Sequence, residues 1–256
     1  MKYGVFSTVF SIAVLALGAP LVAPAEAQMS ARLVAEAPAF QPPDNPRAPL
    51  SGNTNTTGSR GDDSDDQATC ATSMPITLLA PRQQVGQTAS ANPTLTWYVP
   101  AAYAGQEQDL YLYEYDSSGQ TMANILWVSF MPQTGYITYQ LPAEEVQLEP
   151  GKVYEWSVET FCEATNSYVM DEAQIEMVAA AAPLQQSLDQ AASAAEQARL
   201  YGQAGRWYDA IAAVADGSTP AATALRRQLL EDLRQLEDSS GPEPSALALR
   251  LEELLD

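Results

Sequence analysis

The sequence predicts an α+β protein in which a seven-stranded antiparallel β-sandwich is followed by a small bundle of helices. Three observations lead to this fold class. Short segments of alternating polarity recur between residues 75 and 178, with turn-forming residues between them. No helical stretch separates these segments, which argues against a parallel sheet. After Val178 the apolar residues recur at helical spacing instead.

Residues 1–27 have the composition of a secretory signal peptide. Lys2 precedes an apolar run from Val5 to Val22, and Ala25-Glu26-Ala27 matches the pattern of small residues at which such peptides are cleaved. The alternative is an uncleaved membrane anchor, which the prolines at positions 20 and 24 disfavour. We therefore expect an exported protein, periplasmic or extracellular, with no membrane span after cleavage.

Residues 28–68 are expected to form a disordered polar linker. Proline, asparagine, threonine and aspartate dominate this stretch, and it contains too few large apolar residues to offset the entropy lost on ordering. The acidic run Gly61–Asp66 has the ligand type that calcium prefers, but it lacks the glycine and the distant glutamate of an EF-hand. We assign no metal site to it.

Cys70 and Cys162 are the two cysteines of the chain. In an exported protein they allow a single pairing, which would close a loop of about 93 residues and stabilise the fold by roughly 4–5 kcal/mol in the chain-entropy model. The alternative is two separate buried thiols. We expect the disulfide, joining the end of the linker to the far edge of the sandwich.

The sandwich is expected over residues 69–180. Its clearest strand is Tyr154–Glu159, which follows a Pro150-Gly151 turn and places Tyr154, Trp156 and Val158 on one face. The other six strands are expected near residues 75–79, 93–99, 110–115, 124–131, 136–141 and 167–178.

Residues 181–256 are expected to form the helical bundle, with three or four helices. The stretch 184–203 is rich in alanine and glutamine, and Gly205 separates it from a second helix over 206–215. Thr219-Pro220 can cap a third helix with a leucine stripe on one face. A short last helix follows Ser240-Gly241-Pro242.

Tyr111, Tyr113 and Tyr115 are the candidate binding surface, because they share one face of a single strand. Facing solvent, they would form a rigid aromatic platform of the kind on which sugars or protein partners stack. Facing the core or the helices, they would only place their hydroxyls at its rim. The sequence favours the second arrangement.

The tryptophans are expected to be structural. Trp97, Trp127 and Trp156 each lie in an apolar strand, so we place all three in the core. Trp207 lies in the helical part, where it is expected to fasten the helices to the sandwich. Burying an aromatic residue there is worth roughly 2–3 kcal/mol.

Composition excludes several classes of function. The formal net charge of −20 argues against binding to nucleic acid or to an anionic membrane. The chain has no histidine, which removes the usual catalytic triads and almost every zinc site. No phosphate-binding loop or nucleophile elbow is present, and no cofactor is expected. Glu144-Glu145 and Asp171-Glu172 are paired acids, but neighbours on a strand point to opposite faces.

Two regions resemble known modules. Leu148-x-Pro150-x-x-x-Tyr154 resembles the tyrosine corner of a fibronectin type III module, and Thr94–Trp97 followed by Pro100 resembles its second strand. The resemblance implies an Ig-like sandwich. Leu200–Ile211 resembles the middle of a tetratricopeptide repeat, with Gly205 at the turn, but only one copy is visible, which favours a plain helical hairpin packed on the sandwich.

The pattern over the whole length resembles a cyanobacterial exported family catalogued as domain of unknown function number 928. The resemblance covers about residues 70–236, and its sharpest pieces are Trp97–Pro100, Tyr154-x-Trp156 with Cys162, and Gly205–Ala210. The chain differs from the family pattern at residues 163–166. The resemblance implies no particular activity.

We therefore expect an exported, non-catalytic envelope protein that acts as an interaction or accessory module, with an envelope protein or a glycan as its partner. One alternative is a polysaccharide-binding module that uses the tyrosine face. The other is a glycoside hydrolase that uses two carboxylates, for which no shared cleft is evident in the sequence.

Overall fold

The computed structural model describes residues 38–50, 74–103, 105–116, 118–119, 122–162, 167–239 and 243–256. Residues 38–256 make up one compact unit. The predicted signal peptide, Cys70 and the loop at 163–166 lie outside the described residues. The side chain of Cys162 is also not described, so the disulfide stays a prediction.

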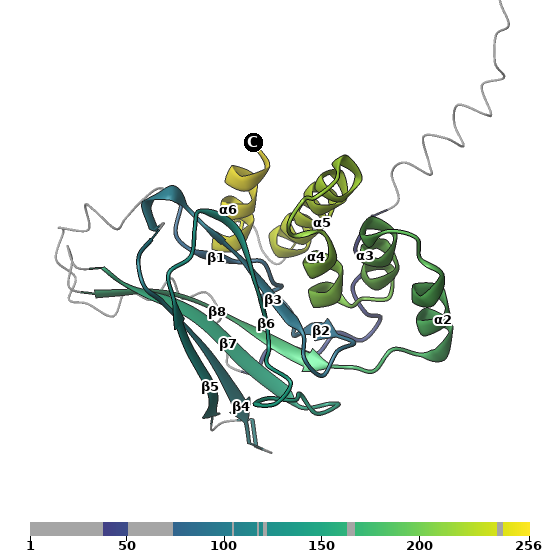
Figure 1. Ribbon diagram of the computed structural model, residues 1–256, viewed down its shortest axis with the longest axis horizontal. Helices are drawn as coiled ribbons and strands as arrows, with labels where there is room; N and C mark the ends of the chain where they lie inside the picture. The colour runs from purple at the N-terminus through teal and green to yellow at the C-terminus, as the bar shows by residue number, and fades with distance from the viewer. Residues whose placement is uncertain are drawn as a thin grey trace, which may run out of the picture. The chain divides into compact units, whose positions relative to one another are not determined.

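Eight strands of the described chain form two sheets (Figure 1). Sheet A has the order β1-β3-β6, and sheet B has the order β2-β8-β7-β4-β5. The strands are β1 (Thr77–Leu78), β2 (Gly86–Thr88), β3 (Thr94–Val99), β4 (Gln108–Tyr115), β5 (Met122–Phe130), β6 (Gly135–Gln140), β7 (Val153–Cys162) and β8 (Ser167–Met177).

The α+β class is confirmed, but the prediction of seven antiparallel strands is wrong in two respects. β2 is an additional strand, and it pairs in parallel with β8, Gly86 opposite Ile175. Its three residues show no alternation of apolar side chains, so no local pattern predicts a strand there. Gly86 is required in this position, because a Cβ would lie 2.6 Å from the ring of Tyr208.

The two sheets share a buried core. Trp97 of β3 and Trp156 of β7 are fully buried, and their ring centroids lie 6.4 Å apart, as the prediction of a core position requires. The hydroxyl of Tyr154 accepts a hydrogen bond from the backbone N–H of Glu149, at 3.0 Å. This is the contact that the tyrosine-corner pattern predicts, and it fixes the turn that precedes β7.

Five helices follow β8 in the described ranges: α2 (Ala182–Gln190), α3 (Ala194–Gln203), α4 (Trp207–Val214), α5 (Pro220–Asp238) and α6 (Ala246–Leu255). The single helix predicted over 184–203 is two helices. The hydroxyl of Ser193 accepts a hydrogen bond from the N–H of Glu196 and so starts α3 anew. Thr219 caps α5 in the same way, as predicted.

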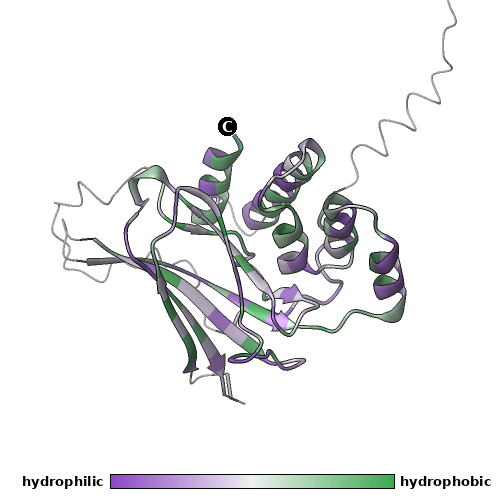
Figure 2. Cartoon of the chain, viewed as in Figure 1, coloured by the Kyte–Doolittle hydropathy of each residue, from purple (hydrophilic) through white to green (hydrophobic). Residues whose placement is uncertain are grey.

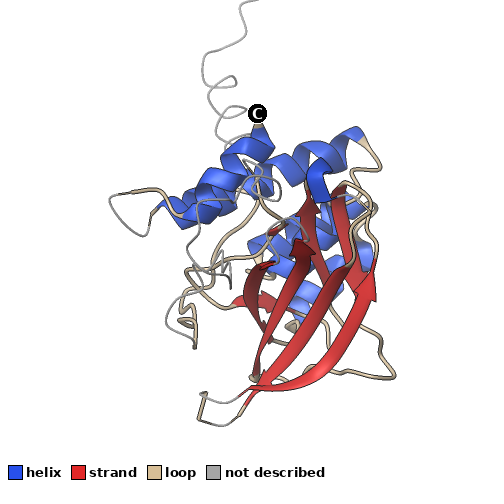
Figure 3. Ribbon diagram, turned by 90° about the vertical axis from the view of Figure 1, so that its left-hand side faces the viewer, coloured by secondary structure: helices blue, strands red, loops and turns tan. Residues whose placement is uncertain are grey.

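Helix α4 joins the helical part to the sheets. The indole N–H of Trp207 donates to the carbonyl of Leu79 at 2.7 Å, which confirms the predicted role of this residue. Tyr208 accepts a hydrogen bond from the indole of Trp156 and donates one to the carbonyl of Gln174, both at 2.9 Å. Figures 1 and 3 show the helices gathered on the side of sheet A, beyond β1 and β3 as seen from β4 and β5.

A buried charge cluster strengthens this junction. Asp171 of β8 accepts hydrogen bonds from Arg82 and from the N–H of Leu78, both at 2.8 Å, and lies 3.3 Å from Arg250 of α6. Glu237 of α5 is buried and accepts a hydrogen bond from the N–H of Arg82 at 2.7 Å. Buried charges of this kind are tolerated only when they are paired and hydrogen-bonded.

Residues 38–50, here called the strap, overturn part of the linker prediction. Phe40 is buried, its ring packs edge-on against Trp207 at 5.0 Å, and its N–H donates to Asp232 at 2.8 Å. Phe40 is the one aromatic residue between positions 28 and 68. Backbone contacts add to its anchoring, because the N–H of Gln41 donates to the carbonyl of Gly202 at 3.0 Å and the N–H of Val85 donates to the carbonyl of Arg47 at 2.9 Å. Residues 51–68 lie outside the described residues.

Candidate functional site

The candidate site is the face of sheet B that points away from sheet A, here called the outer face. Along β4 and β7 the core residues alternate with side chains of the outer face, as the bands of hydropathy in Figure 2 show. The register sets one row across the sheet from β5 to β8: Trp127, Tyr111, Ser157 and Glu172. The neighbouring row in the same order is Ser129, Asp109, Glu159 and Met170.

Three aromatic rings on the outer face form a ladder, which we call the aromatic ladder. The rings of Tyr113 and Tyr111 have centroids 6.0 Å apart and planes within 16° of parallel. Tyr111 continues to Trp127 across the strand pair, with a centroid distance of 6.3 Å and planes within 7°. Parallel offset rings at this spacing attract one another. The ladder is therefore a fixed arrangement rather than three independent side chains.

Polar contacts hold two rings of the ladder, those of Trp127 and Tyr111, in place. The indole N–H of Trp127 donates to a carboxylate oxygen of Asp109 at 3.0 Å, and the hydroxyl of Ser129 donates to the same oxygen. The hydroxyl of Tyr111 is hydrogen-bonded to Glu159. Burial, followed by the charges of Glu159 and Asp109, raises the pKa of Tyr111 to about 12. Its hydroxyl therefore remains protonated at neutral pH.

Trp127 is the most open part of the ladder, with 63% of its surface exposed. The prediction that this tryptophan belongs to the core is wrong. On β5 the neighbours Leu126 and Val128 pair with inward-facing residues of β4, so the side chain between them must point outward. Apolar composition alone does not tell which of the alternating positions faces the core.

The three predicted tyrosines do not share one environment in the structure. Tyr111 and Tyr113 lie on the outer face and are partly exposed, so they do not take the inward arrangement that the sequence favours. Tyr115 is buried, and its hydroxyl donates to Glu155 at 2.6 Å and accepts from Gln174 at 3.0 Å. The sequence pattern could not reveal that Tyr115 is separated from the other two.

The strap explains the burial of Tyr115. The N–H of Leu50 donates to the side chain of Gln174 at 2.9 Å, and Gln174 in turn contacts Tyr115. Val85, Tyr115 and Val153 form a small apolar cluster nearby. The strap thus closes one end of the outer face and leaves the aromatic ladder outside this covered region.

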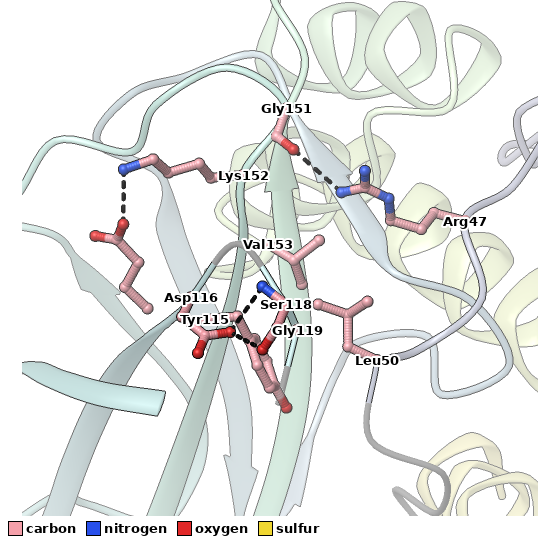
Figure 4. A pocket seen from close by; sticks show the side chains of 10 residues that line it. Arg47, Leu50, Tyr115, Asp116, Ser118, Gly119, Gly151, Lys152 and Val153 are labelled. Atoms are coloured by element: carbon pink, nitrogen blue, oxygen red, sulfur yellow. Dashed lines mark hydrogen bonds and ion pairs between the residues drawn. The ribbon is translucent and has the colours of Figure 1, made fainter. Parts of the chain in front are cut away.

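A pocket of about 500 Å³ lies at the strap end of β4 (Figure 4). Its two cations are already engaged: Arg47 contacts Glu176 at 3.0 Å, and Lys152 contacts Glu114 at 2.6 Å. Hydrogen bonds to Glu114 and then Glu149 raise the pKa of Lys152. The pocket therefore offers little attraction to an anionic ligand.

The outer face is acidic. Strands β4, β5, β7 and β8 contain seven carboxylates and no lysine or arginine: Asp109, Glu114, Glu155, Glu159, Asp171, Glu172 and Glu176. Asp171 points inward to Arg82, whereas Glu172 shares a row with the ladder, so the neighbouring acids do face opposite sides as expected. Asp109 and Trp127 were not among the predicted site residues, because only the strand register brings them together.

The described residues contain no group of three or more histidine, cysteine, aspartate or glutamate side chains placed to hold a metal ion. None of the described helices combines the length and the apolar character that a membrane span requires.

Comparison with known proteins gives one clear relationship. The family model described as Domain of Unknown Function (DUF928) matches residues 55–240. No curated protein matches the chain significantly. The solved structure titled "Structure of T.fusca AA10A" is similar at 8% sequence identity and a TM-score of 0.29, over 39% of this chain and 54% of that one. The chain thus spans about half of that structure, and the TM-score is too low to assign a common fold.

Proposed function

This chain belongs to the family of Domain of Unknown Function (DUF928), and we propose that it is an exported, non-catalytic protein that binds polysaccharide through the outer face of sheet B. One observation carries the proposal: an aromatic ladder with fixed ring orientations ends in a tryptophan that is 63% exposed. Leaving so much apolar surface in water is unfavourable unless a ligand covers it.

The chemistry of the ladder suits sugars. A sugar ring presents C–H groups on its faces and hydroxyls around its edge. The C–H faces stack on aromatic rings such as Trp127, and the hydroxyls donate to nearby carboxylates such as Asp109 and Glu159. Both types of group stand side by side in two adjacent rows of the outer face.

The ladder is also organised before the ligand arrives. The hydrogen bond from Trp127 to Asp109 and the stacking on Tyr111 restrict the indole ring in the free protein. A ligand that contacts an already restricted side chain has less conformational entropy to remove, which favours binding.

Binding without catalysis is favoured over hydrolysis. Asp109 and Glu159 are directly opposite each other on β4 and β7, so they are the pair that a glycosidase mechanism would have to use. A glycosidase encloses its catalytic acid in a water-poor cleft, whereas Asp109 and Glu159 lie partly exposed on a sheet face. We therefore assign them to ligand binding.

Export, the disulfide and the module resemblances form part of the proposal. The tyrosine-corner contact of Tyr154 supports a relationship to fibronectin type III, although the parallel β2 is additional. The α3–α4 hairpin turns at Gly205, which has a φ of 74°, and this supports the likeness to one tetratricopeptide hairpin. Cysteine labelling of the exported protein before and after reduction tests the pairing of Cys70 with Cys162.

Affinity electrophoresis tests the proposed function. The chain beginning at residue 28 is run through native gels that contain neutral or acidic polysaccharides, and its retardation gives a dissociation constant. Trp127→Ala is expected to weaken binding at least tenfold, since a well-packed aromatic contact is worth about 1.5–3 kcal/mol. Leu249→Ala is the matched control, because Leu249 is exposed on α6, away from the ladder. Unchanged binding of Trp127→Ala would refute the proposal.

A further inference from the structure

We propose that the ligand of the outer face is an uncharged polysaccharide, and that the carboxylates beside the aromatic ladder select against acidic polysaccharides. This inference rests on the proposed function and names its ligand class. Its starting observation is that the carboxylates of Asp109 and Glu159 lie on the outer face in the row next to Tyr111 and Trp127, and that strands β8, β7, β4 and β5 contain no basic residue.

The acids stand where a ligand on the ladder would lie. Asp109 is on β4 two residues before Tyr111, and Glu159 is opposite Asp109 on β7. Asp109 is in direct contact with Trp127, and Glu159 is in contact with Tyr111. Any chain that stacks on the rings is therefore brought within reach of both carboxylates, and its own charge decides whether that contact is favourable.

Hydrogen-bonding capacity leads to the same ligand class. An ionised carboxylate accepts hydrogen bonds at about four positions and donates none. Asp109 uses part of this capacity for Trp127 and Ser129, and Glu159 uses part for Tyr111. The acceptor capacity that remains on Asp109 matches the hydroxyl donors of a neutral sugar. A uronate or sulfate group would present acceptors to acceptors, with like charges in contact.

No compensating cation is available from the sheet. Arg82 and Arg250 point to the inner side, where both contact Asp171. Arg47 and Lys152 stand at the strap end of the sheet, and each is already paired with a glutamate. On these four strands an acidic polymer would therefore meet negative charge and none of the arginine or lysine side chains by which anionic groups are usually bound.

A cationic polymer is the other ligand that an acidic surface attracts, but charge alone would hold it. Trp127 is the most exposed aromatic side chain of the face, and a neutral sugar would stack on it while donating to the acceptors beside it. Binding that depends on Trp127 and changes little with salt identifies the uncharged ligand. Binding that is lost at high salt but retained in the Trp127→Ala variant identifies a cationic polymer as the ligand. This result would overturn the inference.

A matched pair of polymers separates the outcomes. The neutral polysaccharide that retards the wild-type chain most is compared with the same polymer oxidised at C6 to a uronate, so that the backbone is unchanged. At about 20 mM salt we expect at least a tenfold weaker binding to the oxidised form, and the difference should shrink at about 0.5 M salt, where charges are screened over a few ångströms.

Two charge variants complete the test. Asp109→Asn/Glu159→Gln is expected to improve binding of the oxidised polymer relative to the neutral one at least threefold. Glu144→Gln/Glu145→Gln removes the same charge from an exposed turn outside the outer face. In this control the ratio of the two dissociation constants, for the oxidised and the neutral polymer, should stay as in the wild type. Equal or tighter wild-type binding of the oxidised polymer, still lost in Trp127→Ala, would overturn this inference and leave polysaccharide binding intact. Failure of every neutral polymer to bind would overturn both.

Discussion

The inner and outer faces of sheet B are built from the same strands, but the same residue types have opposite environments on the two faces. Trp156 on the inner face is fully buried and hydrogen-bonded to Tyr208, whereas Trp127 on the outer face is 63% exposed. Asp171 on the inner face contacts two arginines, whereas Asp109 on the outer face contacts an indole and a hydroxyl. The inner face therefore contributes to stability, and the outer face is available for binding.

The largest difference between the two faces should appear when their tryptophans are truncated. Trp156→Ala removes a large side chain from the shared core and should lower the free energy of unfolding by about 3–5 kcal/mol. Trp127→Ala should change it by less than about 1 kcal/mol, because this ring is mostly in solvent. Urea denaturation followed by circular dichroism measures both. Similar losses in the two variants would mean that the faces do not differ in the way described.

Adjacent acids on β8 provide a second test of the comparison. Asp171→Asn removes the carboxylate charge that both Arg82 and Arg250 contact and should destabilise the protein by about 3 kcal/mol. Glu172→Gln, one residue further on the outer face, should stay within about 0.5 kcal/mol of the wild type. Thermal and urea unfolding of both variants provide the measurement, and equal sensitivity at the two positions would contradict the account.

The strap supplies a third test, because it connects the helical side to one end of the outer face. Phe40→Ala should cost about 2 kcal/mol through loss of its contact with Trp207. It should also raise the hydrogen exchange of the N–H of Leu50, which donates to Gln174. Asp44→Asn, at an exposed position of the strap, is the control and should leave both the stability and the exchange at Leu50 unchanged. Unaltered exchange at Leu50 in Phe40→Ala would show that the two ends of the strap are independent.

The pH dependence of the free energy of unfolding should show a smaller effect, which comes from a partly buried acid. Burial raises the pKa of Asp209 on α4 to about 6, so the folded state binds this proton more tightly than the unfolded state does. Its contribution to the free energy of unfolding therefore falls as the pH rises from about 4 to 6, by about 1–2 kcal/mol. Asp209→Asn should lose this part of the dependence, and its stability relative to the wild type should rise over that range.

The matching measurement is a series of urea denaturations between pH 4 and 7. Leu249→Ala, which changes no titratable group, is the control, and its difference from the wild type should stay nearly constant over this interval. A wild-type chain and an Asp209→Asn variant that follow parallel curves would contradict the assigned pKa. The carboxylate of Asp209 also accepts from the N–H of Ala89 at 2.7 Å, so the variant keeps an acceptor there.

Local patterns were sufficient to predict much of the fold. Alternation located the strands from β3 to β8, and cap residues such as Thr219 located helix starts. β2 could not be predicted, because its three residues are held in place by parallel pairing with β8 and by Tyr208 above Gly86. The ordered strap was missed because its composition is polar, whereas its order comes from buried Phe40 and from hydrogen bonds to residues far along the chain.

The site was predictable only in part. The spacing of Tyr111 and Tyr113 correctly placed them on one face of a strand, but no local signal showed that this face points outward. Trp127 joins them through the pairing of β4 with β5, which is a contact between strands and therefore depends on register. Tyr115 has the same spacing and is removed from the surface by the strap, a segment more than sixty residues earlier in the chain.

The indole N–H signals in a nitrogen–proton NMR spectrum test the central claim most directly. The four tryptophans give four such signals, and Trp127→Phe assigns the one of interest. On titration with a soluble fragment of the bound polysaccharide, the account predicts that the Trp127 signal shifts while those of Trp97, Trp156 and Trp207 stay in place. An unchanged Trp127 signal at saturation, or shifts confined to the buried tryptophans, would contradict it.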